Sequence, residues 1–430
     1  MTRMLRLIAP LLAYFALLGT THAQEAVTPP DSGDTAWMMT STVLVLLMTL
    51  PGLALFYGGL VRAKNVLSIL VQCFVMAALM SVIWVAFGYS LATGSGSNPF
   101  FGDFTKLGLK HLSEGLLQDG GTIPESVWIT FQMTFIIITP ALIVGAFAER
   151  MKFTAMLIFT TIWAVFSYIP VWHMAWGGGL FAGWDVLDFA GGTVVHINAG
   201  IAGLVACIMV GKRRGFPGSA LTPHQVPFTM IGAALLWVGW FGFNAGSAAG
   251  ANASAGMAML TTHTATAVAV LVWMGLEWAI QGKPTAVGVA TGAVAGLVAI
   301  TPAAGTTTVM GSIAIGAVSS LACYFTATKL KHALGYDDSL DVFGVHGVGG
   351  IVGAILTGMF LREGASELGV AAQTFAQFKS VVVTIVWSGV VSVVALSIAK
   401  FTVGLRVPED EEMIGLDRTS HGEEAYSDEG

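Results

Sequence analysis

Apolar segments about as long as a bilayer is thick follow one another along almost the whole of this 430-residue chain. A helix needs roughly 20 apolar residues to cross the hydrocarbon core. Eleven segments approach that length, at residues 36–58, 66–93, 123–147, 152–171, 191–211, 225–247, 256–280, 286–303, 307–331, 341–361 and 374–405. Because 55% of the residues are hydrophobic and only 10% are charged, polar groups are too few to cover a soluble protein of this size. The sequence therefore predicts an all-α polytopic membrane protein with eleven transmembrane helices.

The first 23 residues have the layout of a secretory signal peptide. Two arginines precede an apolar run at 7–18, and small residues follow up to Ala23, after which we expect cleavage. The alternative is an uncleaved membrane helix, which the short run and Pro10 disfavour. We therefore divide the chain into a signal peptide (1–23), a membrane domain (24–405) and a tail (406–430).

Basic residues in the loops predict the orientation of the helices. One side of the predicted topology collects thirteen lysines and arginines, whereas the other side collects four, namely Lys106, Lys110, Arg362 and Lys379. Loops rich in Lys and Arg stay in the cytoplasm. The mature N terminus is therefore predicted to lie outside and the C terminus inside, as eleven crossings require.

Two of the apolar segments place a histidine in closely similar surroundings, VHINAGIAG at 195–203 and VHGVGGIVG at 345–353. His196 and His346 are each followed by glycines four and seven residues later, so that the histidine and both glycines share one helix face. The two segments run in opposite directions in the predicted topology. This indicates an inverted repeat of helices 1–5 and 6–10, with the eleventh helix outside it and a substrate path at the interface of the repeats.

Three interpretations of this histidine pair are open: satisfied core histidines, axial ligands of a haem, and the polar lining of a conduction path. Ionisable residues inside a membrane usually mark a functional path. Two matching positions favour the conduction path, since a haem would need a wide pocket and these helix faces are rich in glycine. A neutral imidazole offers one donor and one acceptor nitrogen to a small polar molecule.

A carboxylate and several aromatic residues precede the histidines. Asp188 is typical of a helix N-cap, and at an outer helix end it would also attract a cation. Phe131 and Phe135 share one face of their helix, and Trp240 and Phe243 share another. Facing rings bind a desolvated cation by cation–π contact and close an apolar constriction.

Other classes of chemistry have little support in the sequence. Cys73, Cys207 and Cys323 lie in apolar segments and are odd in number, so we interpret them as small buried hydrophobic residues rather than a disulfide framework or a metal site. No phosphate-binding Gly-Lys-Ser/Thr loop and no nucleophile elbow is present. We therefore expect neither an enzyme nor a cofactor, and no nucleic-acid partner.

Several motifs resemble those of the ammonium transporter (Amt/Rh) family, most closely its bacterial AmtB branch. They are DFAGGTVVHINAGIAGLV at 188–205, DVFGVHGV at 341–348, PGLALFYGG at 51–59, HMAWGGG at 173–179 and WFGFNAGS at 240–247. The resemblance spans essentially the whole mature chain. It implies an eleven-helix protomer in a homotrimer in the bacterial inner membrane, with a separate hydrophobic pore in each protomer.

The resemblance also implies a role for individual residues. Phe131, Trp176 and Ser247 would form an outer ammonium site, with Asp188 supporting it and favouring the cation. Phe135 and Phe243 would form a gate of phenyl rings, and His196, His346 and Trp240 would line the pore below it. Ammonium would be bound outside, give up a proton and cross largely as ammonia. An alternative is an ammonium sensor that signals through the tail.

The tail has nine carboxylates and two arginines, a net charge of −7. Charge alone favours a solvated appendage. The segment GLDRTSHGEEAY at 415–426, however, resembles the cytoplasmic segment with which the family contacts a PII-type regulator of nitrogen status. The resemblance therefore implies a regulatory tail.

Overall fold

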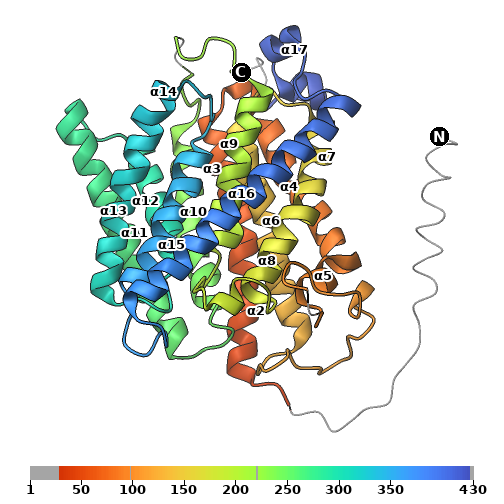
Figure 1. Ribbon diagram of the computed structural model, residues 1–430. Helices are drawn as coiled ribbons and strands as arrows, with labels where there is room; N and C mark the ends of the chain where they lie inside the picture. The colour runs from red at the N-terminus through yellow and green to blue at the C-terminus, as the bar shows by residue number, and fades with distance from the viewer. Residues whose placement is uncertain (1–28, 97, 219–220, 427–430) are drawn as a thin grey trace, which may run out of the picture.

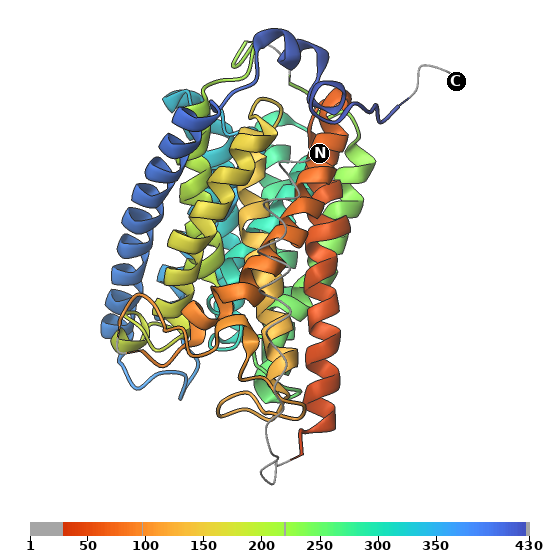
Figure 2. The ribbon, with the colours of Figure 1, turned by 90° about the vertical axis from the view of Figure 1, so that its right-hand side faces the viewer.

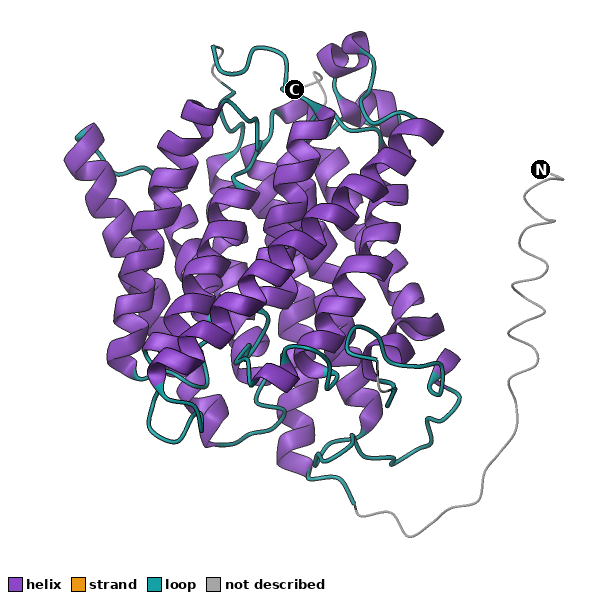
Figure 3. Ribbon diagram, in the orientation of Figure 1, coloured by secondary structure: helices purple, strands orange, loops and turns teal. Residues whose placement is uncertain are grey.

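The computed structural model describes residues 29–96, 98–218 and 221–426. The predicted signal peptide and its cleavage after Ala23 lie outside the described residues. Within them, helices form a bundle whose loops gather at its two ends, and no strand occurs (Figure 3). The all-helical prediction is therefore confirmed.

Nine helical stretches are long and apolar enough to cross a membrane in the described part of the chain. They are α2–α3 (Ser32–Leu60), α4–α5 (Ala63–Thr93), α6 (Glu125–Phe147), α7–α8 (Phe153–Trp176), η7–α9 (Gly192–Val210), α10 with its last turn (Val226–Ala245), α11 (Ala253–Gln281), α13–α14 (Val309–Leu334) and α16 (Val370–Thr402). Two shorter apolar helices are α12 (Ala286–Ile300) and η10–α15 (Phe343–Met359). Each predicted segment overlaps one of these eleven stretches.

Glycines let the helices approach one another at backbone distance. A Cβ on Gly232 of α10 would lie 2.2 Å from the backbone nitrogen of Phe56 in α3, and one on Gly316 of α13 would lie 2.3 Å from the carbonyl oxygen of Ala265 in α11. Neither glycine can therefore be replaced without moving a helix. Such contacts are typical of membrane helices, which associate through small residues.

The two ends of the bundle differ in what they contain. We call the end that carries α17 (Glu409–Ile414) the tail end and the opposite end, where α2 (Ser32–Leu47) starts, the far end (Figures 1 and 2). At the tail end Arg213 pairs with Asp337 at 2.8 Å, and Arg62 pairs with Glu149 at 2.9 Å. Both carboxylates are almost fully buried, and Arg213 also reaches Glu149 at 3.5 Å, so the two carboxylates depend on these two arginines.

The tail packs against the bundle. The carboxylate of Asp417 accepts the backbone N–H groups of Leu67 and Ser68 at 3.0 and 2.7 Å, and so caps the start of α4 (Val66–Ile83). The buried carboxylate of Glu412 accepts the backbone N–H of Arg214 at 3.0 Å. The interpretation from charge alone, a solvated appendage, is therefore wrong, because these carboxylates hold the tail to the protein.

Candidate functional site

The two histidines meet inside the bundle. His196 lies on η7 (Gly192–Ile197) and His346 on η10 (Phe343–Gly347), with 1% and 3% of their surfaces exposed. Their Nδ1 atoms are 3.3 Å apart, and their rings are nearly parallel, with an interplanar angle of 20°. The contact leaves no space between the rings for an iron atom and its macrocycle, which removes the haem interpretation.

Each histidine helix starts at a buried aspartate eight residues earlier. Asp188 accepts the backbone N–H groups of Gly191 and Thr193 at 3.0 and 2.8 Å. Asp188 therefore caps the start of η7 through its side chain, as the sequence predicts, although Gly191 occupies the N-cap position itself. Asp338 accepts the backbone N–H of Phe343, the first residue of η10, at 2.7 Å.

The sequence analysis missed Asp338, since the motif at 341–348 directs attention to Asp341. In the structure Asp341 instead forms an ion pair with Lys331 at 2.5 Å. Burial, and next the charge of Asp341, raise the pKa of Asp338 to about 6. The signal that would have identified Asp338 is its spacing from His346, which equals that of Asp188 from His196.

Glycines bring the two histidine helices into contact. A Cβ on Gly200 would lie 2.2 Å from the backbone nitrogen of Gly347, and one on Gly350 would lie 3.1 Å from the Cβ of His196. Helix α9 (Asn198–Val210) packs against η10, and α15 (Val348–Met359) packs against η7, a reciprocal arrangement that agrees with an inverted repeat. The glycines therefore face the partner helix, as their spacing predicts.

A row of aromatic rings leads from the far end to the histidines. The rings of Phe131 and Phe135 are 5.0 Å apart, and those of Phe135 and Phe243 are 4.3 Å apart. Beyond them the ring of Trp240 stacks on His196 at 5.4 Å. The sequence thus predicted five residues that the structure brings together in one line.

Trp176, Ser247 and Asp188 lie beside this row. The indole nitrogen of Trp176 donates to the carbonyl of Asp188 at 2.7 Å, and its ring is 6.1 Å from that of Phe135. The hydroxyl of Ser247 donates to the carbonyl of Phe243 at 2.8 Å. Trp176 therefore contacts the row at Phe135 and Ser247 at the backbone of Phe243, whereas the carboxylate of Asp188 is directed to its own helix.

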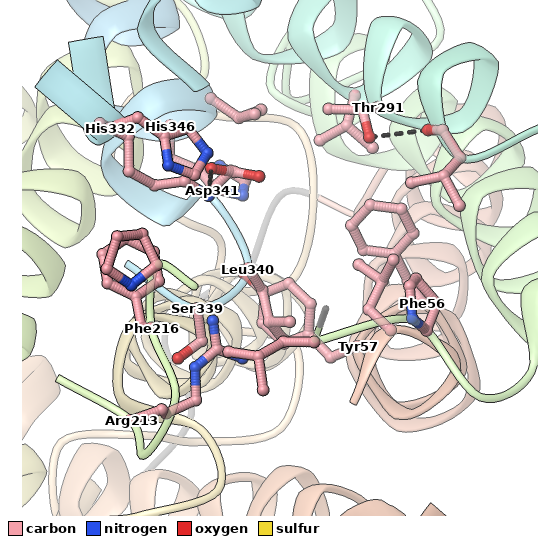
Figure 4. Close-up of a pocket in the computed structure, with 18 residues that line it drawn as sticks. Phe56, Tyr57, Arg213, Phe216, Thr291, His332, Ser339, Leu340, Asp341 and His346 are labelled. Carbon is pink, nitrogen blue, oxygen red and sulfur yellow. Dashed lines mark hydrogen bonds and ion pairs between the residues drawn. The ribbon is translucent and has the colours of Figure 1, made fainter. Parts of the chain in front are cut away.

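Two cavities lie along the histidine pair. The narrower one has a volume of ≈ 10 Å³, room for about one water molecule, and is lined by apolar side chains together with His196, Trp240, Phe243 and His346. The wider one, of ≈ 280 Å³, has Arg213 and Phe216, which lie in the connection between α9 and α10, in its wall (Figure 4). His346 lines both cavities, so it stands where the narrow path meets the wide one.

Of these two cavities, only the wider one is lined by charged side chains other than histidine. Arg213, Lys331 and Asp341 line it, and Phe56 and Thr291 lie across it from His346 (Figure 4). The narrow cavity has no charged wall apart from the ionisable histidines. A neutral molecule therefore meets a lower barrier in it than an ion does.

The chain matches a known protein family along most of its length. The model of the Ammonium Transporter Family matches residues 36–426. The chain belongs to the ammonium transporter family. Ammonium transporters from Aquifex aeolicus and Bacillus subtilis are 47% and 46% identical to it, each over 92% of this chain and over 94% and 99% of their own lengths. It is a multi-pass membrane protein, as its apolar helices and its family require.

Solved structures of the family have the same fold. Mep2 of Saccharomyces cerevisiae has a TM-score of 0.83 at 31% identity, covering 89% of each chain. A protein described as "Sensor Amt Protein" has a TM-score of 0.85 at 27% identity, covering 90% of this chain and 98% of its own.

The three cysteines are buried, as the sequence predicts. Cys73, Cys207 and Cys323 are free and buried. Among the described residues, no group of three His, Cys, Asp or Glu side chains is arranged to hold a metal ion.

Proposed function

We propose that this protein conducts ammonia derived from ammonium through the path that the aromatic row and the histidine pair define. The observation that carries the proposal is the order of groups along that path. Cation-binding rings come first, a closed pair of phenyl rings second, and two contacting imidazoles with an apolar wall third. Each group suits one step in turning a hydrated cation into a neutral molecule.

In the first step ammonium is recruited by Phe131, Trp176 and Ser247. The rings replace part of the hydration shell by cation–π contact, at about 2 kcal/mol when desolvated, and the serine oxygen accepts a hydrogen bond. The field of Asp188 favours the cation. Ammonium then gives up a proton, to water on the outer side or to the histidine relay, because the row beyond this site offers no charged partner.

In the second step ammonia passes between Phe135 and Phe243 and enters the narrow cavity. His196 and His346 each offer hydrogen-bonding nitrogens there, and Trp240 covers the ring of His196. Potassium has no proton to give up, so it cannot become neutral and is stopped. The same histidine pair is placed to relay the proton, which would make transport electrogenic.

Solid-supported membrane recordings test this proposal. An ammonium pulse applied to proteoliposomes should give a saturable current, and an equal potassium pulse should give none. In the His196→Ala, His346→Ala protein the current or its selectivity should be lost, whereas His332→Ala, in the wide cavity, should keep both. A selective current unchanged in the double variant would refute the role of the pair. No current in the native protein, with no change of internal pH, would refute conduction.

We propose that all eleven apolar helices cross the membrane, with the far end outside and the tail end in the cytoplasm. The excess of basic residues on the predicted cytoplasmic side supports this orientation. The signal peptide (1–23) is then removed, and the mature protein consists of the transporter domain (24–405) and the regulatory tail (406–430). The location of the protein would be the inner (cell) membrane of a bacterium, since the matched relatives from Aquifex and Bacillus are bacterial.

A homotrimer, as the resemblance implies, has support from His263. Its side chain is exposed on α11, where its ring lies 5.4 Å from that of Trp237 and 6.1 Å from that of Phe241. An ionisable side chain turned to lipid at that depth is costly. A second copy of the chain would cover it, which native mass spectrometry of the intact protein tests directly.

The second candidate function is ammonium sensing through the tail and a PII-type regulator. Two observations favour it, the docked tail and the likeness to a protein described as a sensor. Deleting residues 406–430 separates the two functions. Uptake should persist and regulation disappear if transport is primary, whereas a sensor should show little uptake with or without the tail.

A further inference from the structure

A buried carboxylate at the far end takes no part in the path described above. Glu125 is the first residue of α6, and only 3% of its surface is exposed. One of its oxygens accepts the hydroxyl of Tyr89 and the ammonium of Lys106, each at 2.7 Å. Its other oxygen lies 3.0 Å from Nε2 of His111. Three polar groups thus converge on one buried charge.

Lys106 and His111 also lie against the ring of Tyr89. The Lys106 ammonium lies 5.2 Å from the centroid of the Tyr89 ring, and the His111 ring is nearly parallel to it, at an angle of 13°. Lys106 and His111 both belong to the connection at 94–124 between α5 (Tyr89–Thr93) and α6. The carboxylate and the tyrosine therefore hold this long connection to the start of α6.

Aromatic contacts run from this cluster to the outer ammonium site. The ring of Tyr89 meets that of Trp84 at 5.7 Å, Trp84 meets Trp172 at 6.1 Å, and Trp172 meets Trp176 at 5.6 Å. All three are edge-to-face contacts, which are favourable for aromatic pairs. Trp176 is the tryptophan of the proposed recruitment site.

Hydrogen bonds attach two of these tryptophans to α6. The indole of Trp84 donates to the carbonyl of Ile129 at 3.1 Å, and the indole of Trp172 donates to the side chain of Gln132 at 2.8 Å. Phe131 lies between these two residues on α6. The cluster around Glu125 thus fixes both the helix that carries Phe131 and the series of edge-to-face contacts from Tyr89 to Trp176.

We propose that Glu125 is a positioning residue for the outer cation site, acting through Tyr89 and the bound Lys106. The inference rests on the proposed function, and it assigns to the cluster the task of holding Phe131 and Trp176 at the spacing that ammonium requires. A buried carboxylate keeps its place only while its charge is paired. Loss of that pairing frees the start of α6 but leaves the phenyl rings and the histidines further along the path in place.

Transport kinetics of Glu125→Gln, measured per folded protein, test the assignment. The amide cannot pair with Lys106, so KM for ammonium should rise roughly five- to tenfold, while the maximal rate stays within about twofold because the deeper path is unchanged. Glu114→Gln, an exposed acid of the same connection, should change neither value, and Lys106→Arg should keep KM close to native. An unchanged KM with a reduced maximal rate indicates a merely structural role and overturns the proposal.

Thermal unfolding of Lys106→Ala provides a measurement that does not depend on transport. This variant should melt at a lower temperature, and ethylammonium chloride should restore part of the loss by filling the vacated place beside the carboxylate. An equal concentration of sodium chloride should not, and the Lys106→Ala, Glu125→Gln protein should not respond. Equal responses to both salts would overturn the role of Lys106 as the necessary charge partner. If the native protein carries no ammonium current, the proposed function fails, and this result still reports on the cluster.

Discussion

Replacing Gly200 by alanine should separate the two helices that carry the pore histidines. The added Cβ would lie 2.2 Å from the nitrogen and 2.3 Å from the Cα of Gly347. Both are backbone atoms, so no side-chain rotation relieves the overlap. Ordinary contact begins at 3.4 Å, and the difference of about 1.2 Å must be made by moving η10 away from α9.

The cost follows from these distances. Overpacking of this kind costs about 1–3 kcal/mol, partly offset by the better helix propensity of alanine, about 1 kcal/mol. Carried to the rings, the same movement would lengthen the 3.3 Å contact between His196 and His346 to about 4.5 Å, beyond hydrogen-bond reach. The variant should therefore lose stability and proton relay together.

Melting temperature and ammonium current per folded protein measure both effects. The matched control is Gly275→Ala on α11, where an added Cβ meets no heavy atom within 4 Å. That control should be as stable as the native protein or slightly more so, with its current unchanged. If Gly200→Ala matched Gly275→Ala in stability and current, the glycine contact would not set the spacing of the histidines.

Four further substitutions, with one exposed control, test the groups that hold the path in place. Asp188→Asn should lower the melting temperature, at a cost of about 1–3 kcal/mol, because a neutral amide replaces a carboxylate that caps η7; differential scanning fluorimetry measures it. Arg213→Ala should cost about 3–5 kcal/mol by leaving Asp337 buried and unpaired. Burial alone would raise the pKa of Asp337, but the hydrogen bond and charge of Arg213 hold it below its usual range. The carboxylate of Asp337 therefore contributes its full stability above the pKa that it has in the unfolded chain, and this contribution is lost as the pH falls through the lower pKa of the folded protein. The melting temperature of Asp337→Asn should for this reason vary less with pH below about pH 4 than that of the native protein. Asp417→Ala should cost about 0.5–2 kcal/mol through the lost cap of α4, whereas the exposed Asp410→Ala should change little in the same melting assay.

The sequence predicted those features that repeat at short range. Apolar length located the eleven long apolar helical stretches, and the matching spacing of His196 and His346 from their glycines predicted two helices in close contact. Asp188 was recognised as a cap because a cap and its helix are neighbours in the chain. Local patterns of this kind need no knowledge of what lies across the bundle.

Features that depend on distant partners were not predictable in the same way. Nothing near Glu125 in the sequence shows that Tyr89 will reach it from another helix. The tail has an acidic composition typical of a solvated segment, and only the position of the start of α4 shows that Asp417 is a cap. Asp338 was overlooked because Asp341 lies in the more recognisable motif, although the eight-residue spacing identifies Asp338 as the counterpart of Asp188.

The two capping aspartates also explain why the histidines occur at the middle of the path. Only the last four or five residues up to each histidine are helical, so each capping aspartate sets its histidine about one turn into its helix, from opposite ends of the bundle. The reciprocal glycine contacts then bring the two rings together at that depth. The carboxylates that cap the two helix starts do not line the narrow cavity, which leaves an apolar constriction where only a neutral molecule crosses at low cost.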